Sequence, residues 1–180
     1  MKHLKLLPIL AIAGLFMLQG CDDELFDITE NFTFEHEFVV YSDENSVDYA
    51  DVIDFAEKEN LIKNYGSKIK KIEVESIQYW IKEHNGSEEQ TMQTVSLSVA
   101  NDDGSDEKDI ISLQDINLLQ LLNNSTQLNP NANGVLKLGN LMESPPHSFM
   151  LLFRTAISEV PADFTIVFSF DLKMTANPMK

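Results

Sequence analysis

The chain has 180 residues, which suits one domain of ordinary size. Its 29 acidic residues outnumber 13 lysines and arginines, so the formal net charge is −16. This balance argues against a nucleic-acid partner, because phosphate binding needs clustered lysine and arginine. It argues equally against electrostatic docking on anionic lipid. With 43% apolar residues and 11 phenylalanines, the chain can build a hydrophobic core and is not a disordered acidic tail.

The beginning of the chain has the build of a secretory signal. Lys2 and Lys5 precede an apolar run over residues 6–18, which is shorter than the roughly 20 residues that span a bilayer. The run ends in Leu18-Gln19-Gly20-Cys21, and this single cysteine has no partner for an internal disulfide. The junction resembles the lipobox of bacterial lipoproteins, which implies removal of residues 1–20 and acyl chains such as palmitate on Cys21. The alternatives are an uncleaved anchor or a buried first helix, with Cys21 as a buried thiol.

Acidic residues follow the cysteine directly, as Asp22-Asp23-Glu24. We expect residues 21–30 to form a solvated tether. An acidic cluster in this place also resembles the surface-export signal of Bacteroidetes lipoproteins, which implies an outer-membrane lipoprotein exposed on the cell surface. In other Gram-negative bacteria an aspartate next to the cysteine favours inner-membrane retention, so the membrane face stays open.

The first regular pattern is a strand, followed by helical spacing. Residues 32–40 alternate with period two, which predicts a half-buried strand with its even-numbered side chains inward. His36 falls on that side, and we interpret it as a hydrogen-bonded histidine, because no second metal ligand stands two positions on. Apolar residues then recur every three or four positions over residues 48–64, which predicts a helix.

Residues 69–82 indicate a long strand whose apolar parity slips near Glu75-Ser76, so we expect a β-bulge there. Asn85-Gly86 is a turn dipeptide, and the apolar alternation of residues 95–99 predicts the partner strand of a hairpin. Trp80 falls opposite the apolar set that contains Tyr79. An exposed aromatic row around Tyr79 or Trp80 would suit sugar stacking, and burial of Trp80 under a second layer is the alternative.

The densest acidic cluster covers residues 101–109, with the sequence N-D-D-G-S-D-E-K-D. Calcium prefers oxygen ligands around a tight turn, and the cluster offers a possible Ca²⁺ site. The spacing misses the EF-hand pattern, so a solvated hairpin loop is the favoured interpretation. The candidate ligands are Asp102, Asp103, Asp106 and Asp109.

The remaining segments complete a β domain. We predict a helix over residues 113–122, an asparagine-rich loop over 123–134, and strands over 135–138, 149–155 and 164–174. The last strand has the cleanest alternation and should be the spine of a sheet. Arg154, the only arginine, is expected to pair with a carboxylate.

These elements predict a mainly β fold, an antiparallel two-layer β-sandwich, immunoglobulin-like or related, with two short inserted helices. We place this single domain over residues 31–177. No nucleophile elbow, phosphate loop, zinc spacing or dinucleotide fingerprint is present in the sequence.

We therefore expect a non-catalytic, lipid-anchored envelope protein whose β domain binds a glycan or another envelope protein. The first alternative is a small hydrolase with a carboxylate site. The second is a structural or adhesin subunit that assembles through strand edges.

Overall fold

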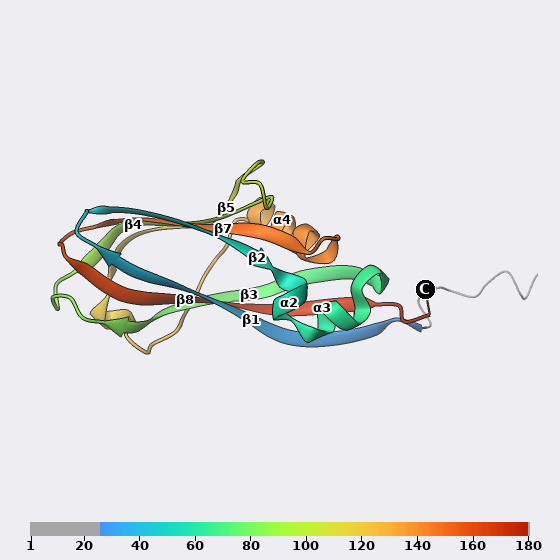
Figure 1. Cartoon of the computed structure of the whole chain (residues 1–180). Coiled ribbons are helices and arrows are strands. Elements are labelled where there is room, and N and C mark those ends of the chain that lie inside the picture. The colour runs from blue at the N-terminus through green and yellow to red at the C-terminus, as the bar shows by residue number, and fades with distance from the viewer. Residues whose placement is uncertain (1–25, 180) are drawn as a thin grey trace, which may run out of the picture.

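Two antiparallel sheets of four strands each lie face to face (Figure 1). The structure is a computed structural model and describes residues 26–179. The strands are β1 (Ile28–Ser42), β2 (Ser46–Asp54), β3 (Ile69–His84), β4 (Thr91–Ala100), β5 (Lys108–Asn117), β6 (Thr126–Gln127), β7 (Ser148–Ile157) and β8 (Ala162–Ala176). The helical segments are α2 (Phe55–Lys58), α3 (Asn60–Tyr65), η2 (Gly66–Lys68), η3 (Leu119–Leu121) and α4 (Ala132–Glu143).

The strand order shows which topology the sandwich has. Sheet A has the order β1-β8-β3-β6, and sheet B has the order β2-β7-β4-β5. This order, in which the chain passes repeatedly between the sheets, is that of a jelly roll. The predicted mainly β, antiparallel two-layer sandwich is confirmed.

The core lies between the sheets and is rich in phenylalanine. Strand β8 pairs with β1 on one side and with β3 on the other, as expected of the sheet's spine. Its Phe168 is fully buried and lies 6.0 Å, between ring centroids, from Phe153 of the opposite sheet. Phe38 of β1 stacks on Phe153 at 5.2 Å. The aromatic rings thus join both sheets, and such pairs add to the stabilisation from burial alone.

The predicted strand over residues 32–40 is confirmed as part of β1, with Phe34, Phe38 and Val40 buried. Strand β1 already begins at Ile28, so the last three residues of the expected tether belong to the sheet. The predicted bulge in β3 is also confirmed, since the register with β8 shifts between Val74 and Ser76.

The predicted helix over residues 48–64 is wrong in its first part. Residues up to Asp54 form β2, which pairs with β7. The helical turn begins only at Phe55, where the side chain of Asp54 accepts a hydrogen bond from the Glu57 amide at 3.1 Å. The alternation of β2 was hidden because an acid, Asp51, occupies an inward position and an apolar residue, Val52, is exposed.

The predicted helix over residues 113–122 is wrong as well. The first half of this segment belongs to β5, and a single 3₁₀ turn, η3, follows. Asp115 has a left-handed φ of 54°, which interrupts the strand and disturbs its alternation. Residues 135–138, predicted as a strand, lie inside helix α4, and the predicted loop over residues 123–134 contains the short strand β6.

The predicted hairpin of β3 with the strand that follows it is wrong. The turn at Asn85-Gly86 exists, but β3 pairs with β8 and β6, whereas β4 pairs with β5 and β7 in the other sheet. A turn dipeptide shows that the chain reverses. It does not show to which sheet the chain returns.

Helix α4 lies beside the sheets, in contact with β3 and β5 (Figure 1). Two buried glycines allow this close approach. A Cβ atom at Gly134 would lie 2.1 Å from the Asp109 carbonyl oxygen, and one at Gly139 would lie 2.6 Å from that of Ile72. The helix thereby packs its backbone against one strand of each sheet, β3 of sheet A and β5 of sheet B.

Candidate functional site

Trp80 lies on the outer face of sheet A. It follows the bulge in β3, and its register partner on β8 is Val167. Its side chain is half-buried, whereas Tyr79, one position earlier, is 3% exposed and faces the core. The Tyr79 ring stacks on Phe168 with 6.3 Å between centroids. The expectation that Tyr79 contributes to an exposed aromatic row is therefore wrong, because strand alternation places it inward, and Trp80 alone of the two reaches the surface.

A shallow hollow of about 370 Å³ surrounds Trp80. Three of its residues form a row across neighbouring strands, since Ser169 of β8 is the register partner of Glu35 on β1 and of Gln78 on β3. The Ser169 hydroxyl points at the Glu35 carboxylate, with 3.5 Å between oxygens. The residues that line the hollow are Glu35, Gln78, Trp80, Asn123, Ser125 and Ser169.

The loop between η3 and β6 completes the hollow. The Asn123 amide donates to the Ile81 carbonyl at 2.8 Å, and the Leu128 amide donates to the Ile77 carbonyl at 2.9 Å. These two bonds hold the loop along β3, so Asn123 and Ser125 stand beside Trp80. Asn123 has a φ of 55°, a left-handed conformation that asparagine tolerates better than most residues.

Sequence reasoning found Trp80 but missed the other lining residues. Period-two alternation placed Glu35 on the outer face of β1, as it did Trp80 on β3, but it did not indicate that the two lie close together. The cross-strand register that brings Glu35, Ser169 and Gln78 into one row carries no local signal. The approach of Asn123 depends on a turn between distant segments, which the asparagine-rich composition alone does not describe.

The hollow has the chemistry of a site for a hydroxyl-rich ligand. The indole offers a flat apolar face, while the amides and hydroxyls both donate and accept hydrogen bonds. One carboxylate, that of Glu35, belongs to the lining residues. A pair of carboxylates, as glycoside hydrolysis needs, is not gathered there by the described part of the chain.

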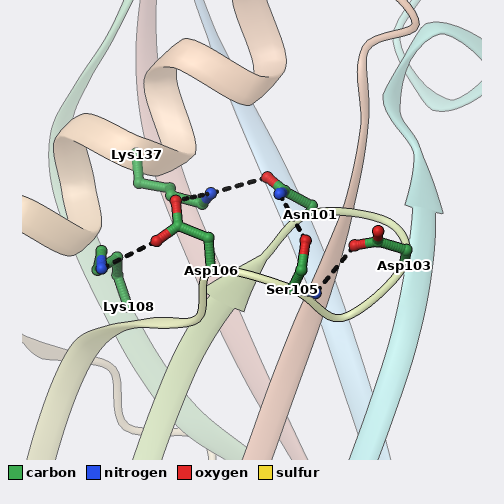
Figure 2. A network of polar contacts seen from close by, with 6 residues as sticks. All are labelled: Asn101, Asp103, Ser105, Asp106, Lys108 and Lys137. Atoms are coloured by element: carbon green, nitrogen blue, oxygen red, sulfur yellow. Dashed lines mark hydrogen bonds and ion pairs between the residues drawn. The ribbon is translucent and has the colours of Figure 1, made fainter.

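The acidic loop between β4 and β5 is tied internally and to helix α4 (Figure 2). The carboxylate of Asp106 accepts from Lys137 at 2.7 Å and from Lys108 at 2.9 Å. These two cations lower the pKa of Asp106 to about 2. Asp103 accepts from the Ser105 amide at 2.9 Å. Hydrogen bonding by the side chain of Ser105, and then by its amide, lowers the pKa of Asp103.

The four proposed calcium ligands are thus not brought to a common point. Asp109 lies apart from the loop's tip and accepts from the Ser98 hydroxyl at 2.9 Å, and Asp102 is exposed. Within residues 26–179, no three histidine, cysteine or acidic side chains lie close enough to hold a metal ion together. The geometry agrees with a hydrogen-bonded hairpin loop.

Arg154 pairs with carboxylates, as predicted. Its guanidinium makes a two-pronged contact with Glu107, in which Nη1 meets Oε1 and Nη2 lies 3.1 Å from Oε2. Its Nε donates to Asp48 at 3.2 Å. The ion pair raises the pKa of Arg154 and lowers that of Glu107.

His36 joins the two sheets at one side of the sandwich. Its Nε2 lies 3.0 Å from a carboxylate oxygen of Asp51, so the contact connects β1 of sheet A with β2 of sheet B. The imidazole also meets the ring of Phe38 edge-on at 4.7 Å. Burial has the largest effect on the pKa of His36 and lowers it, whereas the hydrogen bond and the charge of Asp51 raise it.

No family model and no curated protein matches the chain. Among solved structures the chain is similar to one from turnip yellow mosaic virus, with 13% identity, 85% of this chain and 96% of that chain covered, and a TM-score of 0.38. It is also similar to one from Desmodium yellow mottle tymovirus, with 9% identity, 85% of each chain covered and a TM-score of 0.31. It is also similar to the decameric BFDV capsid protein, with 8% identity, 82% of this chain and 98% of that chain covered, and a TM-score of 0.35. The topology is therefore assigned from the strand order alone.

Within residues 26–179, no helix has both the length and the apolar character needed to cross a membrane.

Proposed function

We propose that this protein is a lipid-anchored protein of the bacterial cell envelope whose β domain binds a glycan without catalysing a reaction. The anchor is supported by the basic start, the short apolar run and the lone Cys21, which lie outside the described residues. The acids at positions 22–24 support export to the outer face of the outer membrane. Palmitate or a similar acyl group on Cys21 is the expected modification.

The hollow around Trp80 is the observation that carries the glycan proposal. Sugar rings present an apolar face of C–H groups and a rim of hydroxyls. The half-buried indole suits the first, and the Gln78 and Asn123 amides suit the second. Net charge −16 favours neutral or basic sugars over acidic ones, because a site in an acidic protein repels anions.

Trp80 is the only tryptophan of the chain, so its fluorescence reports on the hollow directly. We expect titration with the right neutral oligosaccharide to shift the emission of the wild-type protein. Calorimetry should then show that Trp80→Ala loses at least about tenfold in affinity, which is the scale of about 1.4 kcal/mol for one stacking contact.

Two further variants separate stacking from general damage. Trp80→Phe keeps an aromatic face and should retain part of the affinity, and Gln78→Ala should weaken binding without altering the fold. Unchanged affinity in Trp80→Ala, measured by calorimetry with a glycan that the wild type binds, would remove the hollow as the site.

A second candidate is an envelope-protein partner that binds at the strand edges. Strand β1 is one of the two edge strands of sheet A, β2 is one of the two edge strands of sheet B, and the two follow one another in the chain. Val39 and Tyr41 of β1 are 65% and 72% exposed, and Val52 of β2 is 57% exposed. Exposed apolar side chains on edge strands favour pairing with another chain, although the acids nearby oppose pairing of two copies.

A further inference from the structure

The start of β1 and the end of β8 lie at the same end of sheet A (Figure 1). Ala176 is the register partner of both Ile28 and Ile69, so the first residues of β1 and β3 meet there. The Asn177 amide donates to the Lys68 carbonyl at 2.9 Å, which ties the end of β8 to η2. We call this surface the chain-entry end. It consists of Phe26, Asp27, Glu30, Lys68, Lys70, Lys71, Glu73, Lys173 and Met179.

The distance from this end to the anchor is short. Cys21 precedes Phe26 by five positions, which an extended chain covers in at most about 18 Å. If Cys21 carries acyl chains in the bilayer, the chain-entry end must stay within that distance of the headgroups. The tether therefore selects which end of the sandwich faces the membrane.

Charge is distributed unevenly between the two ends. The chain-entry end holds four lysines and three acids, and two of these acids are paired, Asp27 with Lys70 at 2.8 Å and Glu73 with Lys71 at 2.6 Å. At the opposite tip, the loops 43–45, 85–90 and 158–161 contain five acids and no lysine or arginine. A surface of phosphate groups attracts the first end and repels the second.

Apolar side chains accompany the lysines at the chain-entry end. Phe26 is 52% exposed and Met179 is 74% exposed. The lysine side chains have apolar stems, and Lys68 and Lys70 reach over the chain ends to Pro178 and Asp27. Exposed apolar groups flanked by lysine are typical of surfaces that lie in the headgroup region of a bilayer.

From these observations we propose that the chain-entry end rests against the phosphate-bearing headgroups of the bilayer, so that the anchored domain stands with its acidic tip pointing away. This inference depends on the lipid anchor proposed above. It concerns the orientation of an anchored domain and not its recruitment, because the acids at positions 22–24 and the overall charge oppose recruitment by charge alone.

The orientation determines how far the glycan site stands from the membrane. Glu37 of β1 and Trp80 of β3 are both register partners of Val167, and Glu37 lies nine positions beyond Ile28. At about 3.3 Å per strand residue, the hollow stands roughly 30 Å from the chain-entry end. Its ligands would therefore be glycans that extend beyond the headgroups.

The test uses two variants of the full-length, lipidated protein, each with a single tryptophan, which lies at the chain-entry end in one variant and at the opposite tip in the other. In a Trp80→Phe background, Phe26→Trp reports on the chain-entry end and Tyr41→Trp, at a position that is also exposed, reports on the opposite tip. Each variant is reconstituted into phosphatidylglycerol vesicles that contain brominated phospholipid, and quenching of the fluorescence is measured. We expect strong quenching for Phe26→Trp and several-fold weaker quenching for Tyr41→Trp.

A pair of charge reversals tests the contribution of lysine. Lys71 and Lys82 both lie on β3, both are exposed, and each pairs with a glutamate, at 2.6 Å and 2.8 Å. In the Phe26→Trp reporter, Lys71→Glu should reduce quenching, and the matched control Lys82→Glu should leave it unchanged.

Equal quenching at both ends, or equal effects of the two reversals, would overturn the inference. Flotation of the vesicles tests the lipid anchor separately from the orientation. Wild-type protein that floats with the vesicles while Phe26→Trp is not quenched contradicts the orientation alone. Wild-type protein that does not float contradicts the anchor on which the orientation depends.

Discussion

At the scale of single residues, the His36–Asp51 contact combines burial with a charged partner. Its two ring contacts and its position between the sheets remove His36 from water, and burial is the largest effect on its pKa. Asp51 and Glu37 favour the charged imidazolium, whereas Lys58 opposes it. The net result is a pKa lowered from the ordinary value, so the folded protein favours the neutral ring.

This sign gives a prediction for stability against pH. Because the pKa of His36 is lower in the folded state than in the unfolded state, its stabilising contribution is present above the unfolded value, near 6.5, and is lost as the pH falls towards the folded value. Each unit of difference corresponds to about 1.4 kcal/mol. Urea unfolding of the wild type should show a loss of stability between pH 7.5 and pH 5, and His36→Gln should flatten it.

Asp51→Asn provides the companion variant. This change removes the carboxylate that raises the pKa of His36, so that pKa should fall further below its ordinary value. The free energy of unfolding should then depend more steeply on pH. Lys137 and Lys108 lower the pKa of Asp106, and Arg154 lowers that of Glu107, so these two carboxylates do not produce the slope above pH 5. An unchanged slope in His36→Gln would show that another group produces it.

At the scale of secondary-structure elements, helix α4 depends on glycine where it meets the strands. Gly139→Ala places a Cβ atom 2.6 Å from the Ile72 carbonyl oxygen, and a backbone atom cannot move aside as a flexible side chain can. We expect a loss of about 1 to 3 kcal/mol in the free energy of unfolding, the usual cost of overpacking. Chemical denaturation measures it.

The neighbouring position provides the control. Asn140 is exposed on the same helix, and its backbone carbonyl accepts from Ser144, an interaction that does not need the side chain. Asn140→Ala should change the free energy of unfolding by less than about 0.5 kcal/mol or raise it slightly, because alanine has the higher helix propensity. Equal losses in both variants would mean that the close contact is not the cause.

The same element shows why some predictions from sequence failed. Apolar and polar residues alternate cleanly along β8, which lies between β1 and β3 and packs one face against the core. This alternation was sufficient to predict the strand from the sequence. In α4, the Val-Leu-Lys-Leu run between Gly134 and Gly139 imitates a strand. Its helical state depends on contacts with β3 and β5 that lie far away in the sequence. Local spacing is a weak signal where the burial of a segment is decided by distant partners.

At the scale of the whole molecule, the class of fold could be predicted and the pairing could not. Alternation and turns were enough to predict a two-layer sandwich, since both sheets bury one face. The jelly-roll order depends on long-range pairs such as Ile28 with Ala176, for which the sequence has no local marker. The same limit applies to the hollow, because Trp80 could be placed by parity but its neighbours come from three distant segments.

The membrane face is the last whole-molecule question, and it separates the two proposed partners. If residues 22–24 act as a surface-export signal, an outer-membrane-impermeable protease added to intact cells should remove the protein, while a periplasmic control protein survives. A variant in which Asp22, Asp23 and Glu24 become Asn, Asn and Gln keeps Cys21 and should stay protected. Immunodetection before and after lysis measures both.

Either outcome has a consequence for the folded domain. Digestion of the wild type in intact cells, with protection of the variant, places the Trp80 hollow where external glycans reach it, because only a few residues would separate the domain from the proposed anchor at Cys21. Protection of the wild type until lysis contradicts the surface location. The exposed edges of β1 and β2, with Val39, Tyr41 and Val52, then become the better candidate, since a periplasmic domain meets protein partners. Cross-linking at those edges would be the experiment to follow.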